Sequence, residues 1–530
     1  MSSTRQVQHN VYKATTKDAG QGLFASKDLS SGDSIISISR PLFAVLDTPR
    51  LEEACSNCFT WVPRSAIGSR GDGKEEVVLR ACTGCRVVRY CGKGTCLKWG
   101  ELLVMSLGLN PPIQACQTEA WKTVHKHECK IFKHLQPKIL PNSPRLVVQA
   151  ILCHEKGSLS DELYNALMKL LGHLEGFRNA EPEGDTHPWE RLCLIAQAAK
   201  TYSGTKLSEE MVMEIVGKTL VNTLTLVTPT YDPIGLCLDP LVSLINHSCR
   251  PNAVISFSGP RLSIRSIAPI KKDEQITISY IDCTEPFKRR QHELTSKYFF
   301  TCKCKECILK DKGDRDAFTP EPTTEEKKKD LLKEDTNARA ALWKASHESS
   351  SPTEKVETLL LGTRNLQKTG CWPVSRQPYA LLLQDLAVGL IEAGQWILAF
   401  INCIQIYFDI DPIHFPIPHH PVRVVHNWRF TMLALQVSNL DNKGALKEYE
   451  LHWGVIIWGL LNEVASNVDR SHGAESEFAE MVKRKVEEVR VDMSRSDDND
   501  DGGAGSLPTY TDVEREWKKL REIKAKRGFQ

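Results

Sequence analysis

The sequence predicts an α+β protein: a part with strands is interrupted by a cysteine-rich metal-binding segment and followed by a helical C-terminal region. Three observations support this fold class. Eight cysteines gather between residues 55 and 129. The stretch "LINHSCRPNA" at 244–253 precedes the strand-like "DEQITISYID" at 273–282, which is rich in β-branched residues. At 377–408, apolar residues recur at helical spacing and Gly394 separates two helical runs.

Composition excludes binding that depends on bulk charge. The 530 residues carry 68 Lys and Arg against 66 Asp and Glu, a balance that gives no general attraction to nucleic acid or membrane surfaces. The N-terminus has no apolar run typical of a secretory signal. The most apolar region contains Asp385 and Glu392, which favours packed helices over a membrane span. We expect an intracellular monomer, in the nucleus, the cytoplasm or both, with no membrane partner.

The cysteines indicate metal binding. Eighteen cysteines in a reducing compartment should be thiols or metal ligands. The segment 55–129 contains the pairs "CSNC" and "CTGC" and ends in "HKHEC". Two thiolates in one tight turn can reach one tetrahedral ion, and the later His and Cys residues supply enough ligands for two zinc ions.

This segment resembles a MYND zinc finger, in which two C-x2-C pairs are followed by C-x3-C and H-x3-C and two zinc ions are bound in interleaved order. His125, rather than His127, has the H-x3-C spacing to Cys129. The resemblance implies two ligand sets: Cys55, Cys58, Cys91 and Cys116 for one ion, and Cys82, Cys85, His125 and Cys129 for the other.

One spacing departs from the family pattern. Cys96 comes one residue too late after Cys91, and Cys116 fits only if residues 94–114 are removed, which gives "YCGKACQTEAWKTVHKHEC". The segment 93–96 can be encoded with an intron start, and Gln114 with an intron end. We favour a retained intron over the alternative, a genuine surface insertion of the kind that loops tolerate. In either case Cys116 is the better ligand.

A third zinc site is expected further along the chain. "FFTCKCKEC" at 299–307 supplies three cysteines, and a closed structural zinc site takes four ligands. The cysteine of "NHSC" can supply the fourth if the fold brings it there. The expected ligands are Cys249, Cys302, Cys304 and Cys307.

Three motifs, "LINHSCRPNA", "DEQITISYID" and "KYFFTCKCKEC", together resemble a SET domain with its post-SET zinc site. "DAGQGLFASKDLSSGD" at 18–33 resembles the opening SET strands. With the finger, the chain resembles the SET and MYND domain (SMYD-type) protein-lysine methyltransferases. This implies a SET domain split by the finger, S-adenosylmethionine as cofactor and three zinc ions. It also implies a histone or other protein as substrate.

The resemblance also implies roles for individual residues. Tyr280 is the catalytic tyrosine, whose hydroxyl accepts a hydrogen bond from the substrate amine and orients it for attack on the sulfonium methyl. Tyr298 is another wall of the lysine channel, where desolvation favours the neutral amine. Gln21 stands where Asn is common in the family. The implied cofactor-binding residues are Gly20, Gln21, Gly22, Asn222, Asn246, His247, Tyr280 and Phe300.

The expected domain organisation follows the motifs. The C-terminal helices resemble the tetratricopeptide-like domain of the family, although the sequence shows no clean 34-residue period. The expected segments are 1–50 (first part of the SET domain), 51–132 (finger), 133–230 (helical insert), 231–285 (SET core), 286–310 (post-SET site), 311–490 (helical domain) and 491–530 (acidic flexible tail with a short charged helix).

Two other functions compete with the enzyme. The chain could be an adaptor, with a finger that binds proline-rich peptides and a silent SET scaffold. The presence of Asn246, His247 and Tyr280 favours the enzyme, because a scaffold would be free to lose them. DNA binding by the basic stretch "RACTGCRVVRYCGK" at 80–93 is weaker still, since no base-reading helix is evident.

Overall fold

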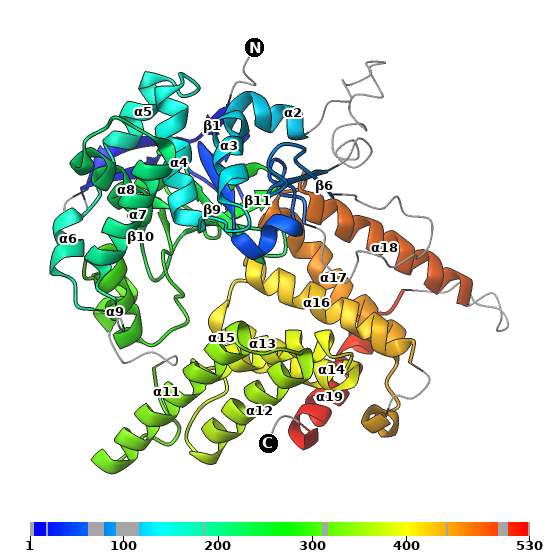
Figure 1. The fold of residues 1–530 in the computed structure, drawn as a ribbon. Helices are drawn as coiled ribbons and strands as arrows, with labels where there is room; N and C mark the ends of the chain where they lie inside the picture. The colour runs from blue at the N-terminus through cyan, green and yellow to red at the C-terminus, as the bar shows by residue number, and fades with distance from the viewer. Residues whose placement is uncertain are drawn as a thin grey trace. The chain divides into compact units, whose positions relative to one another are not determined.

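The computed structural model describes residues 5–16, 20–61, 79–91, 116–182, 184, 186–309, 316–440, 444–496 and 507–527. The predicted insertion at 94–114, with Cys96, lies outside these residues. The described chain forms two compact units (Figure 1). The first comprises Met1–Ile278 with Glu293–Thr301, and the second Ser279–His292 with Cys302–Gln530. The finer division into seven segments stays a prediction. The predicted α+β fold class is confirmed by the sheets of the first unit and the helices of the second.

The largest sheet of the first unit joins strands from distant parts of the sequence. Its order is β1-β4-β12-β11, with antiparallel neighbours throughout. Its strands are β1 (Val7–His9), β4 (Ser34–Ile38), β12 (Arg261–Ser266) and β11 (Ala253–Ser258). Ile36 and Ile38 of β4 and Leu262 and Ile264 of β12 are fully buried. The chain before the finger and the chain after the insert helices therefore share one hydrophobic face.

Smaller sheets complete the β part of the first unit. One has the order β5-β9-β8. Two further pairs are β2–β3, which is antiparallel, and β10–β13, which is parallel. The bounds are β5 (Phe43–Leu46), β9 (Pro233–Leu238), β8 (Leu224–Val227), β2 (Val11–Thr15), β3 (Gln21–Ala25), β10 (Asn246–His247) and β13 (Thr277–Ile278).

The finger contributes little regular structure. A short helix η1 (Thr48–Glu52) leads into it, and β6 (Leu79–Ala81) pairs with β7 (Arg89–Cys91). Its last part is one continuous helical stretch made of α2 (Cys116–Ala120), the π-helical η5 (Trp121–His125) and α3 (Lys126–Leu135). The cysteines, more than the strands, organise this segment.

Helices of the first unit pack around α4 (Asn142–Glu155), whose buried residues Leu146, Val147 and Ile151 belong to its main apolar cluster. Serine hydroxyls cap two of the helices. Ser160 Oγ accepts from the Leu163 N–H, and Ser208 Oγ accepts from the Met211 N–H. The other helices are α5 (Asp161–Met168), α6 (Leu174–Asn179), α7 (Pro188–Ser203), α8 (Glu209–Asn222), η6 (Val242–Leu244) and α9 (Phe287–Tyr298), whose first residues belong to the second unit.

The second unit is helical among its described residues. Consecutive helices pack together, α11 on α12 and α12 on α13, as Figure 1 shows. Thr324 Oγ1 and Ser351 Oγ cap α11 and α12. The helices are α10 (Lys305–Leu309), α11 (Glu325–His347), α12 (Pro352–Lys368), α13 (Tyr379–Glu392), α14 (Trp396–Gln405), η8 (Ile406–Ile410), α15 (Asp411–His414), α16 (Pro421–Ser438), η9 (Gly444–Tyr449), α17 (Trp453–His472), α18 (Glu477–Ser496) and α19 (Tyr510–Arg527).

One helical stretch, Trp396–His414, is long and apolar enough to cross a membrane by length and composition. Its residues Phe400, Ile404 and Ile410 are fully buried. Inside it, Asn402 donates to the Leu383 carbonyl at 2.6 Å. These contacts are those of a core helix packed within the second unit.

The last helix is packed against its unit. Trp517, Leu520 and Ile523 of α19 are buried, and the Trp517 indole N–H donates to the Tyr407 hydroxyl at 3.2 Å. Lys524 pairs with Asp409 at 2.6 Å. The charged helix expected in the tail is thus an anchored element of the second unit.

Candidate active site and zinc centres

The first finger centre contains the four cysteines that the family resemblance implied: Cys55, Cys58, Cys91 and Cys116. Its sulfur atoms all lie within 4.8 Å of one another. Cys91 Sγ lies 3.4 Å from Cys116 Sγ, 3.5 Å from Cys58 Sγ and 3.7 Å from Cys55 Sγ. A tetrahedral zinc ion with Zn–S bonds of about 2.3 Å requires S–S distances of about 3.8 Å. The four thiols therefore fit one zinc ion.

The second centre brings together Cys82, Cys85, His125 and Cys129, all buried. Cys82 Sγ lies 3.9 Å from Cys129 Sγ and 3.2 Å from His125 Nε2. Burial opposes ionisation of Cys82, but backbone N–H groups of Cys85 and Gly84 and the contact with His125 lower the pKa of this thiol to about 7. The site thus favours the thiolate that binds metal. A Cβ atom on Gly84 would lie 2.8 Å from Cys129 Sγ, so only glycine fits beside this ligand.

The third group consists of Cys249, Cys302, Cys304 and Cys307, whose sulfur atoms also lie within 4.8 Å of one another. Three of the four are buried. The structure therefore holds three groups, each able to bind one zinc ion, as the sequence predicted. None of the 17 described cysteines forms a disulfide.

Three backbone segments of the first unit converge on the "NHSC" turn. The strand β10 pairs in parallel with β13, in the register Asn246 with Thr277 and His247 with Ile278. The Asn246 side-chain amide donates to the Gln21 carbonyl at 3.1 Å. The N–H of Ile276, just before β13, donates to the Leu23 carbonyl at 2.8 Å. The opening strand β3 and the end of the SET-like core therefore meet beside Asn246.

Two glycines, Gly20 just before β3 and Gly22 within it, leave room at this junction. Gly20 has a φ of +68°, which a residue with a side chain rarely adopts. A Cβ atom on Gly22 would lie 2.7 Å from Gln275 Nε2 and 2.9 Å from Asn246 Nδ2. Gln275 Nε2 is buried and has no hydrogen-bond partner among the described residues. The junction thus holds a polar donor that a ligand with an acceptor atom could satisfy.

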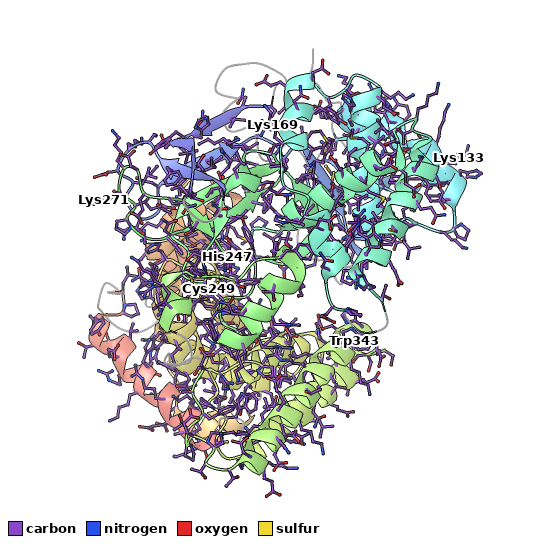
Figure 2. All side chains as sticks on the ribbon, turned by 90° about the vertical axis from the view of Figure 1, so that its left-hand side faces the viewer. Lys133, Lys169, His247, Cys249, Lys271 and Trp343 are labelled. Carbon is purple, nitrogen blue, oxygen red and sulfur yellow. The ribbon has the colours of Figure 1, made fainter. Side chains whose placement is uncertain are left out.

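His247 lies at the centre of several expected contacts. Its Nε2 atom is 3.2 Å from Cys249 Sγ, and Figure 2 shows the two residues next to one another. Its ring centroid is 6.0 Å from that of Phe300. These two rings, both expected to contact the cofactor, are therefore neighbours.

The remaining predicted site residues include Tyr280, Tyr298 and Asn222. Tyr280 follows β13 by two residues. Tyr298 ends α9, where burial and the nearby Glu293 raise its pKa to about 12, so its hydroxyl stays protonated. The side-chain amide of Asn222 donates to the carbonyls of Leu171 and Lys218, each at 2.8 Å. Those two bonds hold the end of α8 and leave only its Oδ1 atom for a cofactor contact.

Comparison with known proteins identifies a SET domain in this chain and several relatives. The SET domain family model matches residues 20–281. The SET domain and MYND-type zinc finger protein 6 of Schizosaccharomyces pombe is 32% identical over 289 residues, covering 54% of this chain and 50% of that protein. Human histone-lysine N-methyltransferase SMYD3 is 28% identical over 340 residues, covering 63% of this chain and 69% of that protein. The chain thus contains a SET domain match and is similar to SET and MYND domain proteins.

These matches cover only part of the related proteins. The chain spans about half the length of the fission yeast relative it matches. Human N-lysine methyltransferase SMYD2 is 25% identical over 346 residues, covering 64% of this chain and 70% of that protein. The SET match begins at Gly20 and ends at Ile281, so it encloses the finger and includes β3, β10 and β13.

Sequence reasoning missed three side chains that support these sites. Glu128 Oε1 lies 3.3 Å from His125 Nδ1, and its Oε2 accepts from Gln149 Nε2 at 3.0 Å. Such a carboxylate orients a metal-binding imidazole, and the His-x-x-Glu spacing on one helix was the available signal. The other two, Asn252 and Gln275, depend on long-range pairing.

Asn252 holds the "NHSC" turn against β13. Its Nδ2 atom donates to the Gln275 carbonyl at 2.9 Å, and its Oδ1 atom accepts from the Thr277 N–H at 2.9 Å. The Asn252 side chain thus provides hydrogen-bond partners for two backbone groups, the Gln275 carbonyl and the Thr277 N–H. No local pattern in "HSCRPNA" distinguishes this asparagine from an ordinary turn residue.

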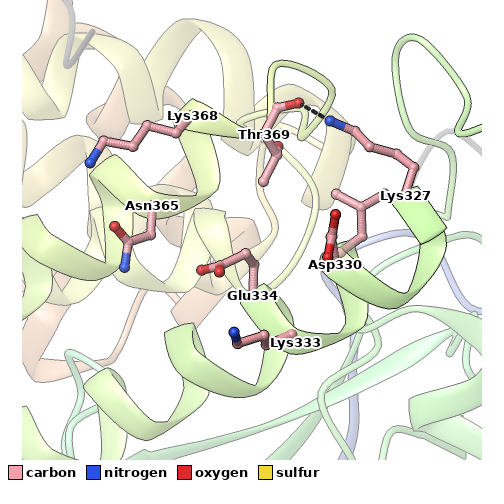
Figure 3. A pocket seen from close by; sticks show the side chains of 8 residues that line it. Lys327, Asp330, Lys333, Glu334, Asn365, Lys368 and Thr369 are labelled. Carbon is pink, nitrogen blue, oxygen red and sulfur yellow. Dashed lines mark hydrogen bonds between the residues drawn. The ribbon is translucent and has the colours of Figure 1, made fainter.

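A separate pocket of about 360 Å³ lies between α11 and α12 of the second unit (Figure 3). Lys327 Nζ donates to the Thr369 carbonyl at 2.9 Å across its rim. Its lining mixes both charge signs, with Lys327, Lys333 and Lys368 beside Asp330 and Glu334. This mixture defines no single ligand chemistry.

Proposed function

We propose that this chain is an S-adenosylmethionine-dependent protein-lysine N-methyltransferase. The observation that carries the proposal is the convergence of the Gly20–Gly22 turn, the Asn246–His247 strand and β13 at one junction. That junction has a tight glycine, a buried amide donor at Gln275 and a histidine–phenylalanine ring pair. Such a site suits a ligand with both an aromatic base and polar groups.

The proposed chemistry gives each residue a task. Bound S-adenosylmethionine would supply an electrophilic methyl group on a sulfonium. Gly22 leaves room for close backbone approach, and the His247–Phe300 ring pair provides an apolar surface for the adenine. Tyr280 accepts a hydrogen bond from the lysine amine and directs its lone pair. Tyr298 remains a neutral hydroxyl at physiological pH and forms a wall of the lysine channel.

The substrate class follows from the names of the relatives. Human SMYD3 is named a histone-lysine methyltransferase, and human SMYD2 an N-lysine methyltransferase. We propose a lysine of a histone or of another protein as substrate. None of the described cysteines forms a disulfide, which agrees with the proposed reducing, intracellular location.

Calorimetric titration with S-adenosylmethionine tests the cofactor part of the proposal. Gly22→Val should abolish binding, because the added atoms fill the space beside Gln275 and Asn246. The control is Gly157→Val: Gly157 lies in an exposed turn with φ +66° and open space around it, so its strain stays far from the site. Equal affinity of the wild type and Gly22→Val would contradict this cofactor site.

A second function is favoured by one side chain of the finger. Trp121 of η5 is 47% exposed, while its ring centroid lies 5.9 Å from that of the ligand His125. We propose that this indole is the contact for proline-rich peptides, which dock on exposed aromatic rings. Trp121→Ala should weaken binding of a proline-rich peptide about tenfold in fluorescence anisotropy while zinc content stays at three ions. Unchanged binding would exclude Trp121 as the contact.

A further inference from the structure

The segment Ser279–Glu285, which contains Tyr280, is folded by its own side chains. Ser279 Oγ donates to the Ile281 carbonyl at 2.6 Å. Asp282 Oδ1 accepts from the N–H of Thr284 at 2.8 Å and from its hydroxyl at 2.6 Å. These short-range bonds define a compact turn, but they do not fix that turn to any helix.

The helices of the second unit provide that attachment. Both carboxylate oxygens of Glu285 accept from Arg339 of α11, each at 2.7 Å. Arg339 Nε also donates to Asp335 at 2.8 Å. Both partners are largely shielded, with side-chain exposures of 12% for Glu285 and 18% for Arg339. A bidentate pair with this little exposure fixes distance and angle, unlike a single contact on the surface.

Three further hydrogen bonds hold this turn and the residues that follow it. Gln377 Nε2, on a side chain almost fully buried, donates to Thr284 Oγ1 at 2.8 Å. The buried Arg290 donates to the Glu285 carbonyl at 2.5 Å. The Phe287 N–H donates to Asp316 Oδ1 at 2.6 Å at the start of α9. Glu285 is the last residue of the turn, and its side chain connects the turn to α11.

We propose that Arg339 is a positioning residue for Tyr280. Through its bidentate pair with Glu285, Arg339 of α11 sets the orientation of the turn that presents the tyrosine hydroxyl. The inference rests on the proposed methyltransferase function. It assigns to the helical unit a part in the chemistry that is separate from any contact with substrate.

The test compares Arg339→Lys with the wild type and with Arg364→Lys, a matched change at an exposed position of α12. Lysine keeps the charge but cannot form the bidentate pair. Hydrogen exchange of the peptide covering Ser279–Phe287 should become about tenfold faster in Arg339→Lys and stay unchanged in Arg364→Lys. Unchanged exchange in Arg339→Lys would overturn the proposal, whatever the activity of the wild type.

Kinetics give the second readout. In Arg339→Lys, kcat should fall about tenfold, while KM for the protein substrate and Kd for S-adenosylmethionine change less than about twofold. In a Tyr280→Phe background the same change should have no further effect, because the two residues act as one unit. Multiplying effects would show that Arg339 acts elsewhere and would overturn the proposal. A wild type without methyl transfer would defeat the proposed function alone, and exchange would still decide whether Arg339 holds the turn.

Discussion

The finger and the helical unit are held together by different means. The buried groups of the finger are mostly ligands, among them Cys55, Cys85 and His125, and its only strands are the three-residue β6 and β7 among the residues described. In the helical unit, large apolar side chains such as Leu386, Phe400 and Phe430 are almost fully buried. The finger therefore depends on metal, whereas the helical unit depends on apolar area removed from water.

Removing one zinc ligand should separate the two regions most clearly. Cys85→Ser should unfold the part of the finger around the second centre, because ligand binding and folding are one equilibrium in such a small segment. Zinc measured by mass spectrometry should fall from three ions to two per chain, with far-UV helicity nearly intact. The control is Cys193→Ser, at a half-buried cysteine that belongs to none of the three groups. Three ions retained by Cys85→Ser would contradict the assigned ligand set.

A core substitution should show the opposite pattern. Leu386 of α13 is fully buried, and Leu386→Ala leaves a cavity. We expect the free energy of unfolding of the helical unit to fall by about 2–5 kcal/mol, measured by urea denaturation, with zinc content unchanged. The exposed Leu361, on α12, provides the control Leu361→Ala, which should cost far less.

The carboxylate of Glu128, beside the zinc ligand His125, tests how far the finger depends on metal. Glu128→Gln removes the charge beside His125 Nδ1 but keeps the shape of the side chain. Zinc affinity of the second centre should fall about 10–100-fold, in competition with a chromophoric chelator. The first centre should keep its affinity, and a uniform loss at both centres would indicate general unfolding instead of a lost partner.

Acid should act on the helical unit without involving metal. Burial, with His426 and His419 nearby, lowers the pKa of His420 to about 3. The unfolded chain takes up this proton near pH 6.5, so the stabilisation is complete above pH 6.5 and is lost as pH falls toward 3. Between pH 7 and 5 the loss should reach about 1–2 kcal/mol. His420→Gln should show a flatter dependence in urea denaturation, and an equal slope would exclude His420 as the cause.

The same contrast explains how far the sequence could predict the sites. Ligand spacing is local, so Cys82, Cys85 and Cys129 could be grouped from the chain alone, whereas Cys249 needed a fold to bring it to its partners. The α+β class was predicted correctly. The hydrogen bonds of Asn252 to the Gln275 carbonyl and the Thr277 N–H were not predicted, because no nearby residue signals a long-range backbone partner. The roles of Tyr280 and Phe300 remain predictions.

The C-terminal helix was expected from the sequence, but its packing was not. The tail was expected to be flexible with a short charged helix, because charges dominate "DVEREWKKLREIKAKRGF". The apolar stripe of this helix consists of three buried side chains, Trp517, Leu520 and Ile523, which are spaced three residues apart along the helix. That narrow stripe is enough to anchor α19, since each of these side chains is nearly or fully buried. A stripe of this length is easily overlooked beside so many charges.

Methyl transfer from labelled S-adenosylmethionine to a mixture of histones and cell extract is the direct test of the proposed enzyme. The wild type, with and without residues 94–114, is compared with Tyr280→Phe. We expect label on a defined protein band and a loss of about 100-fold or more in Tyr280→Phe, with cofactor affinity retained. Equal labelling by Tyr280→Phe, or no label from a wild type that holds three zinc ions and binds the cofactor, would contradict this expectation.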